Sequence, residues 1–223
     1  MSIAENIQSI KSKLPDTVKL VAVSKTKPVE DIMSAYDTGQ RIFGENKVQE
    51  LQKKYEVLPK DIEWHMIGHM QSNKVKYIAP FVSLVHGVDS LKLLNVINKE
   101  GIKNNRVIPC LLQVHIANEE TKFGFDEKEV IELVNSGELG ELKSVDIHGV
   151  MGMATYTDDE NIIRGEFRRL KEIFEKLKLS VFKEKESFST ISMGMSDDYR
   201  IAIEEGSTMV RIGSSIFGVR NYN

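Results

Sequence analysis

Lys25 stands at the end of an apolar run and is the first residue of the chain suited to covalent chemistry. Residues 20–23 are all apolar, which is typical of a parallel strand covered on both faces. Side chains alternate along a strand, so Val21, Val23 and Lys25 are expected to share one face. An amine withdrawn from water favours its neutral form, the nucleophile of Schiff-base chemistry. The alternative is a lysine that merely ends a strand and reaches back to water.

Two loops near the end of the chain are rich in glycine and serine. Residues 192–196 read Ser-Met-Gly-Met-Ser, and residues 211–215 read Arg-Ile-Gly-Ser-Ser. Gly213 would let backbone N–H groups approach a phosphate closely, and Ser196 and Ser214 would add hydroxyl donors. Two ordinary turns with helix caps are the alternative. We prefer a phosphate site, because barrels commonly bind phosphate with the loops after their last two strands.

Arg211 is the one charged residue in the apolar stretch that ends the chain's last predicted strand. It should share a strand face with Met209 and Gly213, while Val210 and Ile212 face the other way. An arginine that points into a site needs an acceptor. A surface ion pair is one possibility, and a phosphate or a pyridine nitrogen is the other.

Other reactive residue types give weaker signals. His65 and His69 are four apart, but they lie on a predicted strand and outside any HExxH pattern, so no metal site is predicted. Cys110 is the only cysteine, which excludes an internal disulfide, and its apolar surroundings indicate inert packing. Four methionines near predicted strand ends could form a soft pocket wall for a flat ring: Met151, Met153, Met193 and Met195.

Eight apolar stretches that alternate with helical ones would position these residues. The predicted strands cover residues 18–25, 41–46, 62–69, 82–88, 107–116, 145–151, 190–193 and 208–213. The predicted helices cover residues 2–14, 28–36, 47–55, 71–78, 90–98, 127–135, 159–177 and 199–205. The longest helix should bury Ile162 and Phe167, and Ser196 or Asp197 should cap the last one.

This rhythm on 223 residues predicts an α/β fold, a single (β/α)8 TIM-type barrel with an extra N-terminal helix. An open doubly wound sheet is the alternative, but no Gly-rich turn follows the first strand. Active sites of such barrels lie at the carboxyl ends of the strands. The fold would therefore gather one set of residues around a single mouth: Lys25, Asn46, His69, His86, Gly149, Met151, Ser192, Ser196, Arg211, Gly213 and Ser214.

Charge and hydropathy exclude several classes of protein. Thirty basic and thirty-three acidic residues give a net charge of −3, which argues against a nucleic-acid partner held by bulk charge. Residues 1–14 lack the apolar centre of a signal peptide, and no apolar run is long enough to span a membrane. We therefore expect a cytoplasmic protein without nucleic-acid or membrane partners.

Seven motifs, in order over nearly the whole chain, resemble the pyridoxal phosphate homeostasis protein family (YggS/PROSC type). This family is a single-domain relative of the barrel half of alanine racemase. The motifs are Ala-Val-Ser-Lys-Thr-Lys-Pro at 22–28, Phe-Gly-Glu-Asn at 43–46 with Val-Gln-Glu at 48–50, Trp-His-Met-Ile-Gly-His-Met-Gln-Ser-Asn-Lys at 64–74, Lys-Phe-Gly at 122–124, His-Gly-Val-Met-Gly-Met at 148–153, Ser-Met-Gly-Met-Ser-Asp-Asp at 192–198 and Arg-Ile-Gly-Ser-Ser-Ile-Phe-Gly at 211–218.

The resemblance implies that residues 1–223 form one barrel domain that binds pyridoxal 5′-phosphate (PLP). It assigns seven residues to the cofactor: Lys25 to a Schiff base, Ser196, Gly213 and Ser214 to the phosphate, Arg211 to the pyridine nitrogen, and Asn46 and Met195 to the ring. Ser214 stands where many members have threonine, which keeps the hydroxyl.

The preferred function is storage, delivery or buffering of PLP by a monomer, with PLP-dependent apoenzymes as candidate recipients, rather than catalysis. An arginine beside the pyridine nitrogen keeps that nitrogen unprotonated and weakens the ring as an electron sink. The sequence ends soon after the eighth strand, so no domain with a second base is expected, and His148 should point away from the mouth. The alternatives are a PLP-dependent racemase or lyase with Lys25 as base, and a sugar-phosphate isomerase, which would need paired carboxylates.

Overall fold

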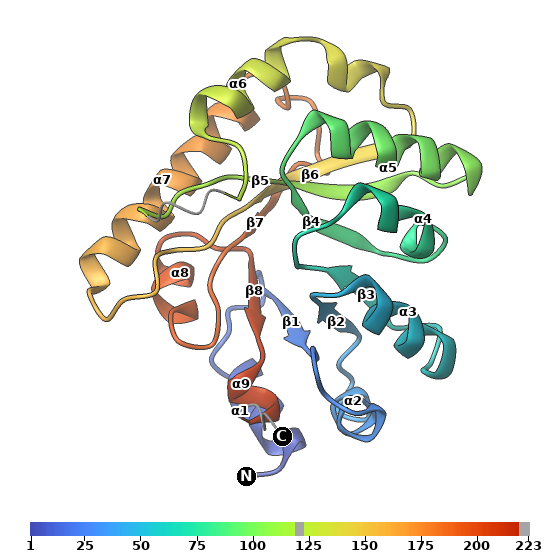
Figure 1. The fold of residues 1–223 in the computed structure, drawn as a ribbon. Coiled ribbons are helices and arrows are strands. Elements are labelled where there is room, and N and C mark those ends of the chain that lie inside the picture. Colours follow the sequence, from blue (N-terminus) through green and yellow to red (C-terminus); the bar gives the residue numbers. More distant parts are fainter. Residues whose placement is uncertain (119–122, 219–223) are drawn as a thin grey trace.

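The computed structural model describes residues 1–118 and 123–218. Eight parallel strands form a closed barrel in chain order, and the last strand pairs back with the first (Figure 1). The strands are β1 Lys19–Val23, β2 Ile42–Glu45, β3 Glu63–Met66, β4 Leu84–Val88, β5 Ile108–Gln113, β6 Val145–Met151, β7 Thr190–Ser192 and β8 Met209–Ile212. The predicted TIM-type barrel is therefore confirmed. Most strands are shorter than predicted, because the polar residues at the predicted ends belong to turns.

Helices lie around the outside of the barrel (Figure 1). They are α1 Ile3–Lys11, α2 Val29–Tyr36, α3 Val48–Val57, α4 Val75–Ile78, α5 Leu91–Lys103, α6 Glu127–Asn135, α7 Glu160–Leu179, α8 Tyr199–Glu204 and α9 Ser214–Phe217, with 3₁₀ turns at Ser72–Lys74 and Glu138–Glu141. The predicted extra N-terminal helix is α1. The short α9 was not predicted from the sequence; it packs on α1, where Asn6 Nδ2 donates to the carbonyl of Ile216 at 2.9 Å.

Two apolar clusters form the core. The larger one lies between the barrel and the helices and includes Ala22, Val210 and Ile212. A small cluster fills the inside of the barrel: Val21, Leu84, Leu111, Met151 and Met209. The predicted alternation along β1 and β8 is thus confirmed, and Arg211 lies between two residues that face outward.

The predicted buried face of α7 was wrong at one residue. Ile162 is 41% exposed, whereas Ile163 is 6% exposed and packs with Phe167. The helix begins at Glu160, and positions 163, 167 and 170 follow one another at helical spacing. Glu166 is also buried on this helix, because its carboxylate accepts hydrogen bonds from the backbone and side chain of Thr155.

Within residues 1–118 and 123–218, no helix combines the length and the apolar character needed to cross a membrane.

Candidate active site

A cavity of about 270 Å³ opens at the carboxyl ends of β1, β2, β3 and β8. All seven residues that the sequence predicted for the site line this cavity: Lys25, Asn46, Met195, Ser196, Arg211, Gly213 and Ser214. The pairing of β1 with β8 brings together the two segments that supply most of the predicted site residues. In this pairing Val21 lies opposite Arg211 and Ala22 lies opposite Ile212. Residues almost two hundred positions apart therefore share one wall. The role of these seven residues as cofactor ligands remains a prediction.

Lys25 lies in a tight turn just beyond β1. The N–H of Ser24 donates to the carbonyl of Gly44 at 3.1 Å, and the N–H of Lys27 closes the turn on the carbonyl of Ser24 at 3.0 Å. Lys25 is half-buried and lines the cavity together with Val23. Lys27 also lines the cavity, but its Nζ donates to the carbonyl of Phe217 at 2.8 Å. Both lysines therefore line the cavity, and Lys25 stays the residue that the sequence predicts for the Schiff base.

A buried charged cluster lies beneath this turn. Lys54 Nζ, from α3, lies 2.7 Å from both Glu45 Oε1 on β2 and Glu50 Oε1 on α3. Ser24 Oγ donates to Glu45 Oε1 at 2.6 Å. Burial raises the pKa of Glu45 to about 7, although Lys54 and Ser24 oppose that rise. Glu45 therefore titrates in the physiological range.

The two expected phosphate loops meet at the cavity, where Gly213 packs beside Val23 of β1. The N–H of Gly213 donates to Ser196 Oγ at 3.1 Å, which ties the two loops together. Gly213 does not have a left-handed backbone; a Cβ there would lie 3.3 Å from the Val23 Cβ and carbonyl oxygen, so close packing explains the glycine. A phosphate would meet the two serine hydroxyls at this end, and it would share the Gly213 N–H with Ser196.

Asp198 orders the first of these loops. Its Oδ1 accepts from the N–H of Met195 at 2.5 Å, and it is the residue that precedes α8. Burial raises the pKa of Asp198. The prediction that Ser196 or Asp197 caps this helix was wrong, because the helix starts one residue later than an Asp197 cap would place it.

Arg211 forms the floor of the cavity. Its Nη1 donates to the carbonyl and to the Oγ of Ser192 at 2.8 and 2.6 Å, and its Nη2 donates to the carbonyl of Gly152 at 3.1 Å. Burial lowers the pKa of Arg211 to about 10, so it remains a cation near neutral pH. A guanidinium carries five N–H donors, so the described residues leave Arg211 with donor capacity for a ligand.

A row of neutral groups continues from Arg211 across the barrel interior. Ser192 Oγ lies 3.0 Å from His86 Nδ1, and His86 Nε2 lies 2.9 Å from His65 Nδ1. Burial lowers the pKa of His65 to about 3 and that of His86 well below its ordinary value. Both rings are therefore neutral, and they support Ser192 without adding charge under Arg211.

Several residues expected at the mouth lie elsewhere. His86 and Ser192 are buried under the cavity, Met151 fills the barrel and Met193 joins the outer core, so only Met153 and Met195 of the four methionines line the cavity. His69 is half-exposed and pairs with Asp89 at 3.1 Å. Gly149 lies within β6 and packs against β7. For His69 the expectation failed because β3 ends at Met66, three residues earlier, whereas His86, Gly149 and Met151 lie within strands whose predicted ends were correct.

His148 lies away from the cavity. Its Nε2 is 2.6 Å from Asp146 Oδ2, and Asp146 Oδ1 is 2.6 Å from Lys185 Nζ, in the loop before β7. That loop belongs to the amino ends of the strands. Cys110 is buried, and burial raises its pKa, which fits inert packing. Among the described residues, no group of three His, Cys, Asp or Glu side chains could hold a metal ion.

Sequence reasoning did not assign four other cavity residues to the site: Ile67, Tyr156, Asp197 and Gly218. Ile67 directly follows β3, and only the exact end of that strand would have placed it. Tyr156 is 87% exposed and comes from the loop between β6 and α7. The apolar residues of that loop follow no helical or strand periodicity, so the sequence could not predict the position of Tyr156.

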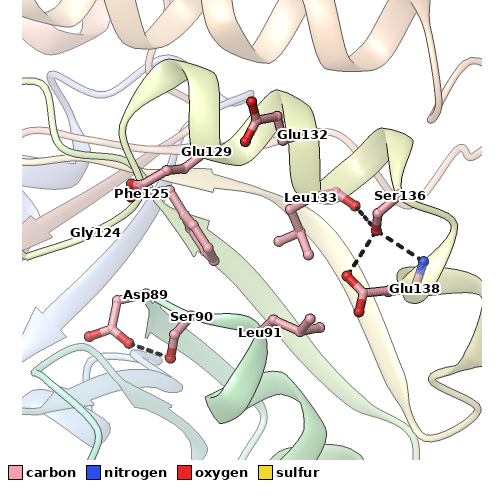
Figure 2. A pocket seen from close by; sticks show the side chains of 10 residues that line it. All are labelled: Asp89, Ser90, Leu91, Gly124, Phe125, Glu129, Glu132, Leu133, Ser136 and Glu138. Atoms are coloured by element: carbon pink, nitrogen blue, oxygen red, sulfur yellow. Dashed lines mark hydrogen bonds between the residues drawn. The ribbon is translucent and has the colours of Figure 1, made fainter.

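A second, larger cavity lies away from this chemistry, between α5 and α6 (Figure 2). It measures about 490 Å³, and its walls combine Leu91, Phe125 and Leu133 with Asp89 and Glu132. Among the described residues, four carboxylates line this larger cavity, whereas the smaller cavity has one, Asp197, beside two lysines and Arg211. Carboxylates repel a phosphate anion. We therefore place the candidate site in the smaller cavity, where a lysine, an arginine and two serines converge.

Comparison with known proteins identifies the family of the chain. The family model "Alanine racemase, N-terminal domain" matches residues 1–221. A pyridoxal phosphate homeostasis protein of Aquifex aeolicus is 42% identical over 205 residues, 92% of this chain and 88% of the relative. One of Haemophilus influenzae is 38% identical over 236 residues, 100% of this chain and 98% of the relative.

Solved structures share the fold. PipY of Synechococcus elongatus with PLP bound superposes with a TM-score of 0.87 at 33% identity, covering 97% of this chain and all of PipY. An alanine racemase of Clostridium difficile has a TM-score of 0.80 at 14% identity and covers all of this chain but 58% of the racemase, which shows the common barrel alone. The motif at 122–124 begins at Lys122, outside the described residues. From the family model and these relatives, the chain belongs to the pyridoxal phosphate homeostasis protein family.

Proposed function

We propose that this chain binds PLP in the mouth cavity, attached to Lys25, and that it stores, delivers or buffers the cofactor rather than catalysing a reaction. The observation that carries the proposal is the convergence of an amine, a buried guanidinium and a pair of serine hydroxyls in one cavity of about 270 Å³. A homologue at 33% identity is described with PLP bound, which supports the same ligand here.

The donor set fits the three functional groups of PLP. Lys25 offers an amine to the aldehyde. Arg211 offers a donor to the pyridine nitrogen, since its five N–H groups exceed its three described hydrogen bonds. Ser196 and Ser214 offer hydroxyls to the phosphate in the same cavity. When bound, PLP supplies an aldehyde that condenses with an amine and releases one water.

The protein residues favour holding the cofactor over using it. Arg211, a buried cation, donates to the ring nitrogen and so disfavours a proton there, which weakens the ring as an electron sink. A catalytic base must be held within hydrogen-bond reach of its proton. Tyr156 lines the cavity, but 87% of its surface is exposed. His148 bonds Asp146 away from the cavity.

A spectrum and a turnover assay on one preparation test this proposal. The purified protein should be yellow from bound PLP, and the colour should be lost in Lys25→Ala. A chiral assay over the common amino acids should show no racemisation above free PLP. Racemisation or loss of α-hydrogen well above free PLP, abolished by Lys25→Ala and reduced by Tyr156→Phe, would establish the racemase or lyase alternative.

The proposal also covers the location, the oligomeric state and the partners of the protein. We place it in the cytoplasm as a monomer, with PLP-dependent apoenzymes as recipients and without nucleic-acid or membrane partners. Support comes from the balanced charge of −3. Size-exclusion chromatography with light scattering tests the monomer. Activation of a PLP-dependent apoenzyme by the loaded protein, in the presence of a trap for free PLP, tests direct delivery.

A further inference from the structure

Thr26 has a backbone conformation that a β-branched residue rarely adopts. Its φ is +64°, in the left-handed region, and it is the third residue of the turn that Lys27 closes on Ser24. Glycine or asparagine is favoured at such a position, so a threonine there is strained. Strain of this kind persists only where the surroundings hold the backbone. Lys25 immediately precedes Thr26, so the groups that hold this turn also position Lys25.

Three side chains hold the turn on both sides of the lysine. Before it, Ser24 Oγ donates to Glu45 Oε1 at 2.6 Å, and Lys54 Nζ donates to the carbonyl of Ser24 at 2.7 Å. After it, the N–H of Thr26 donates to Glu50 Oε1 at 2.5 Å. Lys54 also joins the two carboxylates, at 2.7 Å from each. We call Glu45, Glu50 and Lys54 the clamp.

Burying the charged groups of the clamp costs free energy, so their burial needs a functional explanation. The side chains of Lys54 and Glu45 are 8% and 0% exposed. Withdrawing two such charges from water is expensive, and a buried ion pair is weak support for stability. Its hydrogen bonds are charge-assisted and end on the backbone of a strained turn. Holding that turn is therefore the effect that the arrangement accounts for best.

We propose that Glu45, Glu50 and Lys54 are positioning residues that hold the turn so that the amine of Lys25, rather than that of Lys27, is presented to the cofactor. This inference rests on the proposed function of Lys25. Lys27 is an internal competitor, because it lines the same cavity and lies only two residues away. Its Nζ is occupied by the carbonyls of Phe217 and Gly218 at 2.8 and 3.3 Å. If the clamp only stabilised the fold, loosening it would not change which lysine reacts.

The first arm of the test measures that choice. Cofactor-free wild type, Glu50→Gln and Lys54→Met are incubated with PLP and reduced with borohydride, and tandem mass spectrometry gives the ratio of adduct on Lys25 to adduct on Lys27. We expect almost all wild-type adduct on Lys25. The ratio should fall about tenfold or more in Lys54→Met, which loses charge-assisted hydrogen bonds. It should fall about threefold in Glu50→Gln, whose neutral amide oxygen still accepts from the Thr26 N–H but more weakly.

Arg106→Met is the matched control. Arg106 is also a cation that holds backbone carbonyls, those of Ala79 and Val82 at 2.7 and 2.8 Å. It lies just before β5, at the amino end of the barrel, so its loss should weaken the fold without changing the Lys25 to Lys27 ratio. An equal fall of the ratio in Arg106→Met would overturn the inference, since general loosening would then explain it.

The second arm needs no cofactor. Amide hydrogen exchange of Thr26 and Lys27, followed by NMR, reports how firmly the turn is held. Both amides should exchange at least about threefold faster in Glu50→Gln, whose neutral oxygen accepts more weakly, and at least about tenfold faster in Lys54→Met, while amides of β8 keep their rates. If Lys54→Met does not fold, the result for Glu50→Gln tests the inference. Glu50→Gln should fold, because the Glu50 side chain is already 24% exposed and a glutamine side chain has the same shape as glutamate.

The two arms separate the inference from the proposed function. A wild-type adduct on a lysine other than Lys25 would overturn the proposed function, and the exchange arm would then still decide whether the clamp holds the turn. A wild-type adduct on Lys25, with ratio and exchange both unchanged in folded Glu50→Gln, would overturn the clamp alone.

Discussion

The two ends of the mouth cavity are held by different kinds of polar network. At the Lys25 end, the clamp consists of three ionisable side chains, and the pKa of Glu45 is about 7. At the ring end, Arg211 rests on Ser192 and His86. There the cation has a pKa of about 10, and the buried histidine has a pKa well below its ordinary value. Of Glu45, Arg211 and His86, Glu45 is the group whose pKa lies near neutrality.

This difference separates two tasks. The ring end needs a fixed electrostatic environment, because the state of the pyridine nitrogen depends on the charge beside it. The Lys25 end makes and releases a covalent bond, and a network that titrates near neutrality can adjust how firmly that lysine is held. Two single-residue changes at the Lys25 end, one at the phosphate loop and one at the ring end test the comparison.

Lys54→Met should have the largest effect. It leaves Glu45 buried without its cation, and removing one partner of a buried pair costs about 3–5 kcal/mol. Urea denaturation at pH 7 should show this loss. Lys103→Met is the control, since Lys103 is 56% exposed and pairs with Glu100 at the surface; it should cost less than about 1 kcal/mol. Equal losses in the two variants would contradict a buried clamp.

Glu45→Gln should change the pH dependence of stability. The carboxyl titrates near 4.5 when unfolded and near 7 when folded, so between these values the folded chain binds more protons and wild-type stability falls as pH rises. The fall should reach on the order of 3 kcal/mol, because each pKa unit is worth about 1.4 kcal/mol. Glu45→Gln should lack it.

Urea denaturation at pH 5 and pH 8 measures this difference. The exposed Glu141→Gln should keep the wild-type profile. If Glu45→Gln and wild type lost stability in parallel, the titrating group would lie outside the clamp.

Ser196→Ala should weaken the binding of PLP by about ten- to a hundredfold, because a hydrogen bond to a charged group is worth about 1.5–3 kcal/mol. Pyridoxal, which has no phosphate, should bind the variant and the wild type alike. Ser215→Ala is the control, since Ser215 is exposed and does not line the cavity. Absorbance titration of cofactor-free protein gives the affinities. An equal loss of affinity for PLP and for pyridoxal would contradict a contact between the phosphate and Ser196.

Ser192→Ala should have the smallest effect. Arg211 loses one hydrogen bond of 2.6 Å but keeps its bonds to two backbone carbonyls. We expect PLP affinity to fall about fivefold, because one such hydrogen bond contributes about 1 kcal/mol. The factor should be the same at pH 6 and pH 8, with Ser34→Ala on α2 as the control. A factor that changed severalfold with pH would contradict a fixed ring end.

Much of this was predictable from the sequence. Alternating apolar runs and helical patterns predicted the barrel, and the rule that sites lie at strand ends brought Lys25, Asn46 and Arg211 to one mouth. The polar support was not predictable. Glu50 and Lys54 are four apart on α3, a spacing that usually indicates an exposed helical pair. Only the packing of α3 on β2 buries Lys54, while Glu50 stays partly exposed.

Errors arose where one residue of register decides the outcome. Ile162 and Ile163 are equally apolar, so composition could not choose the buried one on α7. Met193 and Met195 lie two apart in one loop, yet the first is buried in the outer core and the second lines the cavity. Gly194, between them, has a φ of +93°, and this turn breaks the alternation on which the prediction depended.

A crystal structure of the chain grown with PLP tests the central claim most directly. The account predicts electron density continuous from Lys25 Nζ into the ligand, with the ring nitrogen beside Arg211 and the phosphate against Ser196 and Ser214. PLP attached through Lys27, or bound with its phosphate turned away from both serines, would contradict the account.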